Sequence, residues 1–470
     1  MDEITVAVTN TPGGENRSWH GTLQNRKIDG YVGKLISYDT TEQHFDFSFN
    51  LPPELDRPTV YLILNGNEYA TALWPRFGSA SLNVSSRTFE IRIPFLLRGA
   101  HVTEDYECIS SLTCYTPILL NLFGIKPFEQ RHEDDHQTSI RTNFGTATTY
   151  SSSIGAIKLW VGGSTGSSFE KIDIVFTCGF TVELKEKISI TAATKMTQRV
   201  EAFISLLCFD YIHFEKVTVG IKSERAIPNT LKLIDEDPNA EIETDIHAAE
   251  LFRSQRHQNS KTTLSRLNLP MRLTPEFPCA EIFEKFLSLY ERIERSFSWY
   301  RTAQIEDRYL EDHFFYSVRM IEAAYQALAI KLSKNETPSA LDGICQAVKD
   351  NPILAKFLKK RVEPIFTKPS LGSIVRDIRD RYREIPLTRI LDEAMIGKLR
   401  NKEAHGTTER YTGDDYRYMM ITRDLLVMIY PCLILEASGV NRDFLLNHLK
   451  NGPHEYAKFF SEKYASTVVD

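Results

Sequence analysis

Residues 280–300, AEIFEKFLSLYERIERSFSWY, carry apolar side chains at intervals of three and four residues. These side chains are Ile282, Phe286, Leu289, Ile293, Phe297 and Tyr300. The interval is that of an amphipathic helix, because a strand would show a period of two. Phe314, Val318, Ile321, Tyr325 and Leu328 repeat the pattern. We therefore expect the chain to be helical from about residue 280 onward.

More helices are predicted in the same half of the chain, at 341–349, 352–361, 371–382, 387–403 and 415–437. Together they predict an all-α bundle over 280–450, followed by a C-terminal tail over 451–470. The most apolar run, 425–435, is too short to cross a bilayer and contains Pro431. The sequence therefore predicts no membrane partner.

The first half of the chain shows period-two alternation, for example in 60–64 (VYLIL, followed by Asn65-Gly66) and in 88–93 (TFEIRI). This predicts a mostly antiparallel β domain over 1–225. The Thr- and Ser-rich stretch 130–155 is predicted to be a long loop or insertion. Residues 226–279 are acidic, then polar, then proline-containing, which predicts a connector with short helices. The predicted fold class is α+β and multidomain.

Composition narrows the class of protein. The chain has 470 residues, of which 42% are hydrophobic and 25% charged, which is typical of a globular protein and excludes disorder as the main feature. Its net charge of −6 excludes a polycation that coats nucleic acid. The seven cysteines form no CxxC and the N-terminus MDEITVAV is no signal peptide, so reduced thiols and a cytoplasmic location are expected.

Two motifs of binding sites can be set aside. Gly162–Gly166 lacks the Gly-Lys-Ser/Thr that completes a phosphate-binding loop, so a turn is predicted there. His132 and His136 have the spacing of metal ligands on a helix, but they lie in a polar segment without a helical stripe. We therefore predict neither a metal nor a cofactor.

Residues 397–406, GKLRNKEAHG, are the most informative for function. Arg-x4-His occurs three times, at Arg131/His136, Arg308/His313 and Arg400/His405. Only the third has Asn after Arg and ends an apolar helix just before a glycine. Asn401 and His405 are four residues apart and share a helix face. Taken alone, the pattern also fits a helix end at which Arg and His bind the last carbonyl groups.

Leu399-Arg400-Asn401-x2-Ala404-His405-Gly406, in a helical C-terminal half, resembles the ribonuclease motif of HEPN domains and in particular the ApeA-like subgroup. The helix Phe314-Phe315-x2-Val318-x2-Ile321-Glu322-Ala323 is also similar, so the resemblance covers about 280–450. The first half, most clearly Trp19-His20-Gly21-Thr22-Leu23, resembles the β-rich, sensor-like domain of ApeA-type proteins.

This resemblance implies an anti-phage (abortive infection) effector: a metal-independent endoribonuclease, with transfer RNA as the family-level expectation for its substrate. It implies a homodimer or higher homo-oligomer through the HEPN domain. It also implies 2′,3′-cyclic phosphate products and an N-terminal domain that senses a trigger such as a phage protein. An unrestrained ribonuclease would harm its host, so we expect the resting protein to be inhibited.

The residue types suit that chemistry. The ordinary pKa of histidine is near neutrality, so His405 suits general acid–base work. Arg400 offers a planar, charged fork for phosphate, and Asn401 can orient either group. Glu322 is the fourth candidate catalytic residue. It flanks the apolar face of its helix, where a carboxylate needs a partner. The resemblance makes Arg400 or a histidine that partner; the alternative is that Glu322 reaches solvent.

The stretch 356–402 has 13 basic and 6 acidic residues, a local balance of +7. Such a concentration of charge favours a phosphate-binding surface. We predict RNA contacts from Lys398, Lys402, Arg379 and Arg383, with Tyr382 and Tyr411 as candidates for base stacking. The alternative is an ordinary solvated helix face held by salt bridges.

Two other functions remain open from the sequence. One is a non-catalytic HEPN scaffold that binds nucleic acid or a partner. The other is a carbohydrate or small-molecule binder in the β domain with a helical oligomerisation tail. The second predicts no effect of changing His405.

Overall fold

A computed structural model gives the architecture, and the chain separates into two compact units. The first comprises 1–201, 212–261 and 273–280, and the second comprises 202–211, 262–272 and 281–470. The structure describes residues 3–9, 17–26, 30–37, 55–83, 86–103, 105–125, 128–134, 137–167, 172–214, 216–223, 227–228, 244–253, 273, 277–304, 308–328, 346, 351, 353–354, 369–405, 411–451 and 455–469.

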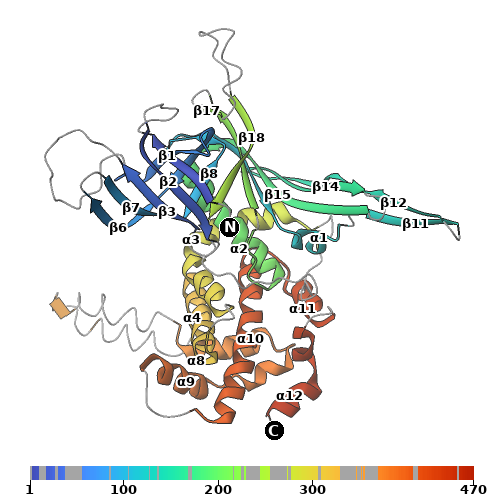
Figure 1. Ribbon diagram of the computed structural model, residues 1–470. Coiled ribbons are helices and arrows are strands. Elements are labelled where there is room, and N and C mark those ends of the chain that lie inside the picture. Colours follow the sequence, from blue (N-terminus) through green and yellow to red (C-terminus); the bar gives the residue numbers. More distant parts are fainter. Residues whose placement is uncertain are drawn as a thin grey trace. The chain divides into compact units, whose positions relative to one another are not determined.

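The first unit is built on an antiparallel sheet (Figure 1). The strand order in it is β13-β14-β15-β10-β16-β18-β8-β5-β4-β1-β2-β3-β7-β6. The bounds are β1 Glu3–Thr9, β2 Arg17–Arg26, β3 Gly30–Ser37, β4 Thr59–Leu64, β5 Glu68–Leu73, β6 Arg76–Asn83, β7 Ser86–Ile93, β8 Phe95–Arg98, β10 Ile109–Tyr115, β13 Gly145–Ser151, β14 Gly155–Ser167, β15 Ile172–Ile188, β16 Lys216–Ser223 and β18 Thr244–Arg253.

β1 and β4 lie in the core of this unit. Val6, Val8, Leu62 and Leu64 share one buried cluster. Ala7 and Ile63, which point to the opposite face, are buried as well, so both faces of these strands are covered. Trp19 packs there too, edge-on to Phe89 with ring centroids 5.4 Å apart. The mostly antiparallel β architecture predicted for the first half is confirmed.

Two stretches of this unit differ from the prediction. The polar stretch 130–155 is not a long loop: β11 (Phe128–Asp134) and β12 (Gln137–Thr142) form a hairpin, and β13 follows. Gly162–Gly166 is not a turn but part of β14, paired along its length with β15. Thr- and Gly-rich strands of this kind lack the apolar alternation by which a strand is recognised in sequence.

The predicted connector, 226–279, also holds a strand. Its described part includes β18, which pairs with β16 on one side and β8 on the other. A two-residue bridge joins β17 (Ile227–Pro228) to β9 (Ala100–His101). The expected short helices are absent from the described part of this stretch before α3. The predicted boundaries at 225 and 279 stay predictions, because much of 224–276 lies outside the described residues.

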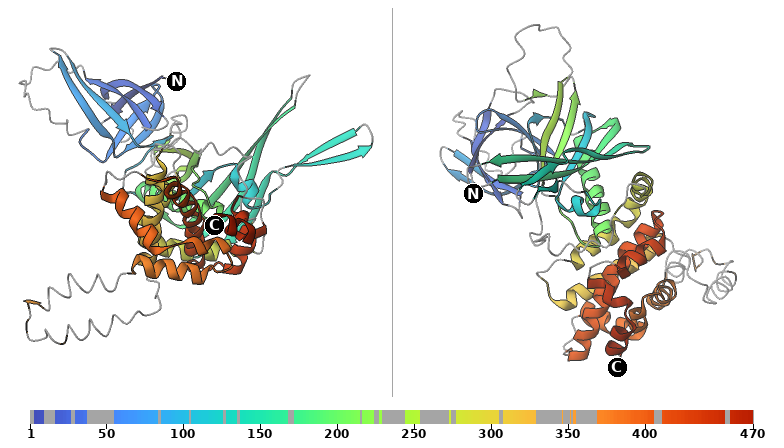
Figure 2. Two further views of the ribbon diagram at one scale, coloured as in Figure 1. Left: turned by 90° about the horizontal axis from the view of Figure 1, so that it is seen from below. Right: turned by 90° about the vertical axis from the view of Figure 1, so that its right-hand side faces the viewer.

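The second unit is helical, as expected, and its helices (yellow to red) lie together in both views of Figure 2. The helices are α3 (Cys279–Ala303), α4 (Leu310–Leu328), α8 (Leu371–Arg381), α9 (Glu393–His405), α10 (Gly413–Ala437), α11 (Arg442–Asn451) and α12 (Glu462–Val469), with 3-10 turns η4 (Pro386–Ile390) and η5 (Glu455–Phe460). Earlier in the chain lie α1 (Ile118–Leu122) and α2 (Ile190–Cys208).

The predicted apolar faces of α3 and α4 are buried. Phe286, Ile293 and Tyr300 of α3 are fully or almost fully buried, as are Phe314 and Tyr325 of α4. The helix predicted at 371–382 is present as α8. The helices predicted at 341–349 and 352–361 lie outside the described residues apart from 346 and 353–354.

One helical prediction needs correction. The helix predicted over 387–403 is interrupted: η4 ends at Ile390, and α9 starts afresh after Asp392. The stretch predicted as a C-terminal tail, 451–470, contains η5 and α12, in which Phe459 and Ala465 are buried.

α10 contains a long apolar stretch. By length and composition alone it could cross a membrane, but 78% of the relevant window is buried inside the unit, and core helices pass the same test. Six cysteines are free and buried, as expected, and burial raises the pKa of the Cys108 thiol to about 11. Cys345 lies outside the described residues.

Candidate active site

The predicted motif lies on α9, which packs against α4 and α8. Asp392 caps α9, because its Oδ1 accepts a hydrogen bond from the backbone N–H of Met395 at 2.7 Å. Ile396 and Leu399 anchor the helix in the core of the unit. This packing places Arg400, one residue after Leu399, beside α4.

Arg400 and Glu322 form an ion pair across the two helices, 78 residues apart in sequence. Arg400 Nη2 donates to Glu322 Oε2 at 3.1 Å. The same oxygen accepts from Arg319 Nη1 at 3.3 Å, one turn earlier on α4. Of the two partners expected for Glu322, Arg400 or a histidine, the structure shows Arg400, and the alternative of a solvated carboxylate does not hold. The side-chain exposures are 16% for Glu322 and 24% for Arg400.

The guanidinium of Arg400 retains unused binding capacity. Its Nε is buried and has no hydrogen-bond partner in the described part of the chain. A buried donor left in that state costs about 1–3 kcal/mol. Nε itself does not face solvent, but the side chain as a whole is 24% exposed. A partly exposed arginine held at one edge by a carboxylate is suited to bind an anionic oxygen with its remaining N–H donors.

The other two motif residues occupy the last turns of α9. Asn401 is exposed. His405 is the final residue of the helix, and its side chain lies outside the described residues. The helical backbone places positions 401 and 405 on one face, as predicted.

The start of α10 adds a cluster that the sequence did not predict. Lys402 Nζ lies 4.3 Å from the centroid of the Tyr411 ring, and the Tyr411 hydroxyl donates to Glu403 Oε2 at 3.0 Å. Thr412 and Asp415 then form a capping box for α10. The hydrogen bond from the Thr412 backbone N–H lowers the pKa of Asp415.

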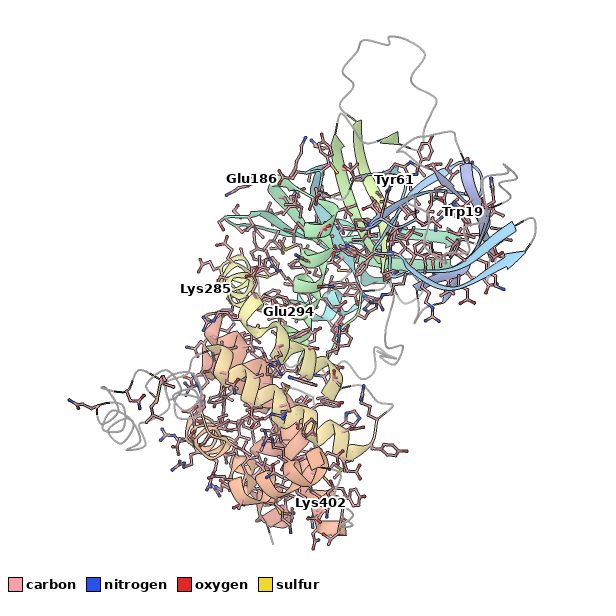
Figure 3. All side chains as sticks on the ribbon, turned by 90° about the vertical axis from the view of Figure 1, so that its left-hand side faces the viewer. Trp19, Tyr61, Glu186, Lys285, Glu294 and Lys402 are labelled. Atoms are coloured by element: carbon pink, nitrogen blue, oxygen red, sulfur yellow. The ribbon has the colours of Figure 1, made fainter. Side chains whose placement is uncertain are left out.

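Lys402 therefore departs from its predicted place on an RNA-binding surface. It is only 8% exposed, and it lies among the side chains of the helical unit (Figure 3). Tyr382 departs too: it is fully buried and donates to Glu436 Oε1 at 2.8 Å, so it cannot stack on a base. Tyr411 is half-buried under Lys402.

The remaining predicted RNA contacts are exposed. Arg379 and Lys398 face solvent, and neither forms an ion pair with a described residue. Arg383 is exposed as well, beside Glu384 at 3.7 Å. Other cations of the basic stretch are paired: Arg381 with Glu436, and Arg389 with Glu462. The open cationic surface is therefore smaller than the +7 balance suggested, and its part before 369 lies outside the described residues.

The second Arg-x4-His pattern is structural. His313 is buried and its Nδ1 lies 2.8 Å from the carbonyl oxygen of Ala303, with a pKa lowered by burial. Arg308 lies over the ring of Tyr316. No group of three His, Cys, Asp or Glu residues that could hold a metal ion occurs in the described ranges.

Comparison with known proteins places the chain in a family. The family described as ApeA N-terminal domain 1 matches residues 32–288, more than half of the chain. The chain belongs to the ApeA family of anti-phage defence proteins. No curated protein and no solved structure matches it.

The ApeA match covers most of the sheet and the first turns of α3. Trp19–Leu23 precede the match, so their resemblance stays a prediction. α4 and α9 follow it, and the HEPN assignment of 280–450 rests on the residues alone.

Proposed function

We propose that the helical unit of this ApeA-family protein is a HEPN endoribonuclease, and that RNA cleavage is how the protein acts in anti-phage defence. The observation that carries the proposal is the pairing of Arg400 with Glu322. It holds the partly exposed guanidinium of Arg400 beside Asn401, and His405 follows one turn later on the same helix.

The proposed reaction is transesterification within the RNA. The 2′-hydroxyl attacks the adjacent phosphorus as its proton passes to a base, and the bond to the 5′-oxygen breaks as that oxygen takes up a proton. The products are a 2′,3′-cyclic phosphate and a 5′-hydroxyl. His405 serves in proton transfer, Arg400 binds the phosphorane oxygens, and Asn401 orients the phosphate or the imidazole.

Glu322 is a positioning residue in this scheme. Its carboxylate already accepts from two arginines, so its role is to hold Arg400 in place rather than to move a proton. Arg379, Arg383 and Lys398 would contact the RNA backbone; Lys402, tied to Tyr411, would support the site from within. No metal is required by this chemistry, since arginine supplies the positive charge.

Three further parts of the proposal follow from the family resemblance. Transfer RNA is the proposed substrate, and a homodimer is the proposed assembly, in which two copies of the motif share a cleft. The β-sheet unit is proposed to respond to a trigger such as a phage protein, and the resting protein to be inactive in the cytoplasm.

The test compares wild type with His405→Ala in cells exposed to phage, following total RNA and survival. We expect His405-dependent RNA fragments, and purified protein should make fragments ending in 2′,3′-cyclic phosphate with or without EDTA. Identical RNA profiles for the two proteins would leave the non-catalytic scaffold as the function. Cleavage abolished by EDTA would remove the metal-free mechanism but leave the nuclease.

A further inference from the structure

We propose that one face of α4, beside the candidate active site, binds a single-stranded segment of the RNA by stacking. This surface is called the α4 strip. It consists of Phe315, Tyr316 and Arg319 of α4, Trp299 of α3, and Arg308, which lies just before α4. The inference rests on the proposed function and deepens it, because it states which form of RNA the site accepts.

One end of the α4 strip groups two aromatic rings and an arginine around Tyr316. Trp299 and Tyr316 are stacked, with ring centroids 5.3 Å apart and an interplanar angle of 16°. Arg308 lies over the Tyr316 ring at 5.2 Å and donates to its hydroxyl at 3.3 Å. Arg308 is exposed, so its planar guanidinium is accessible to a base.

The strip continues from this stack to Arg400. The Phe315 and Tyr316 rings are 5.7 Å apart, and Arg319 lies over Phe315 at 5.3 Å. Arg319 then shares Glu322 with Arg400. Residues 315, 319 and 322 recur at helical spacing, so an RNA strand along this face would run straight to the proposed site.

The adjacent residue Tyr309 adds an exposed ring. It follows Arg308 directly and is 81% exposed, whereas Trp299, Phe315 and Tyr316 are partly exposed. Exposed aromatic rings and arginine planes, alternating along a surface, are the features by which proteins bind unpaired bases without sequence preference. Bases within a duplex are stacked on each other and cannot use such a surface.

Charge supports base stacking over bulk attraction to phosphate. The strip and the adjacent site carry three positive charges, on Arg308, Arg319 and Arg400. Three carboxylates offset them: Glu322, and Glu311 and Asp312 in the first turn of α4. The net charge is therefore small. Each arginine–phosphate contact that does form should contribute about 0.7 to the slope of log affinity against log salt for a single strand.

The test uses the full chain carrying His405→Ala, so that RNA is not cut. Its probes are a fluorescein-labelled 12-nucleotide RNA of mixed sequence and the same strand annealed to its complement, with affinity read by anisotropy. Tyr316→Leu removes the ring but keeps apolar volume. Arg308→Gln/Tyr309→Ala changes only exposed side chains, so it tests the strip even where Tyr316→Leu fails to fold.

The helical unit offers matched controls. Tyr464→Leu removes a ring that also has a cation over it, Lys458 at 5.8 Å, and Arg389→Gln removes an exposed arginine. We expect both strip variants to weaken single-strand binding about fivefold or more, and the controls less than twofold. The duplex should bind weakly to the parent and unchanged to the variants.

Several results would overturn the inference. These are no single-strand binding by the parent, equal loss for strip and control variants, or tighter binding of the duplex. A fall in oligomeric state on Tyr316→Leu, seen by sedimentation velocity without a loss of affinity, would assign the strip to contact with a second copy. Strip-dependent binding without His405-dependent cleavage would instead refute the proposed function and leave the strip standing.

Discussion

Replacing Glu322 by Gln should destabilise the helical unit by about 1.5 kcal/mol. The carboxylate accepts two charged hydrogen bonds, from Arg400 at 3.1 Å and Arg319 at 3.3 Å. A bond to a charged group contributes about 1.5–3 kcal/mol and a neutral one about 0.5–1.5, so the amide loses about 1 kcal/mol at Arg400. Arg319 is 41% exposed, and its pair adds about 0.5 kcal/mol.

The assay is equilibrium unfolding in urea, which is uncharged and does not screen the pair as guanidinium would. The matched control is Glu462→Gln. Glu462 binds Arg389 twice, at 3.1 and 3.2 Å, but both side chains are more than 60% exposed. We expect this control to lose less than about 0.5 kcal/mol.

A double-mutant cycle isolates the pair itself. Glu322→Gln combined with Arg400→Gln should cost less than the two single changes added together, with a coupling of about 1 kcal/mol. Equal losses for Glu322→Gln and Glu462→Gln, or a coupling near zero, would refute the claim that this partly buried pair holds Arg400 in place.

Two pH-dependent effects should accompany it. The pKa of Asp415 is lowered in the folded protein, so this residue stabilises the fold fully above the unfolded pKa of about 3.9, and the stabilisation is lost as the pH falls further. Asp415→Asn should therefore lower the free energy of unfolding by about 1 kcal/mol at pH 7. In thermal unfolding, the difference between the variant and wild type should disappear below about pH 3. Burial lowers the pKa of His313, so below about pH 6.5 the unfolded chain binds a proton that the folded chain does not, and the free energy of unfolding falls. In urea unfolding, His313→Gln should lose less stability than wild type between about pH 7.5 and 5.5. The same pH dependence for variant and wild type would count against a buried neutral imidazole.

The sequence predicted best where burial leaves a regular pattern. The three- and four-residue spacing from Ile282 to Tyr300 corresponds to a buried helix face, and VYLIL at 60–64 to a buried strand. The predictions from sequence failed for strands that are defined by hydrogen bonds to neighbouring strands rather than by a buried face. The hairpin of β11 and β12 has few apolar residues, and β18 is recognisable by its two neighbours in the sheet rather than by its own sequence.

The candidate site, too, was predicted only in part from the sequence. The α9 motif and the partner of Glu322 were predicted, although the interruption before α9 was missed. Asp392, an N-cap residue type after Pro386, was the available signal. Arg319 and the Lys402–Tyr411 pair were missed, because contacts across helices or around a helix end leave no period in the sequence. The side chain of His405 lies beyond the described residues, so its role stays a prediction.

The place of β18 in the strand order bears on how the protein is made. β8 and β16 both leave an open hydrogen-bonding edge until residues 244–253 have been synthesised, and β18 then joins the two parts of the sheet. Arg400 follows Arg253 by about 150 residues, which at roughly 5–20 residues per second takes the ribosome about 7–30 s. The sheet can thus be complete on the nascent chain before the proposed nuclease residues emerge, so the unit proposed to sense the trigger would fold before the proposed active site exists.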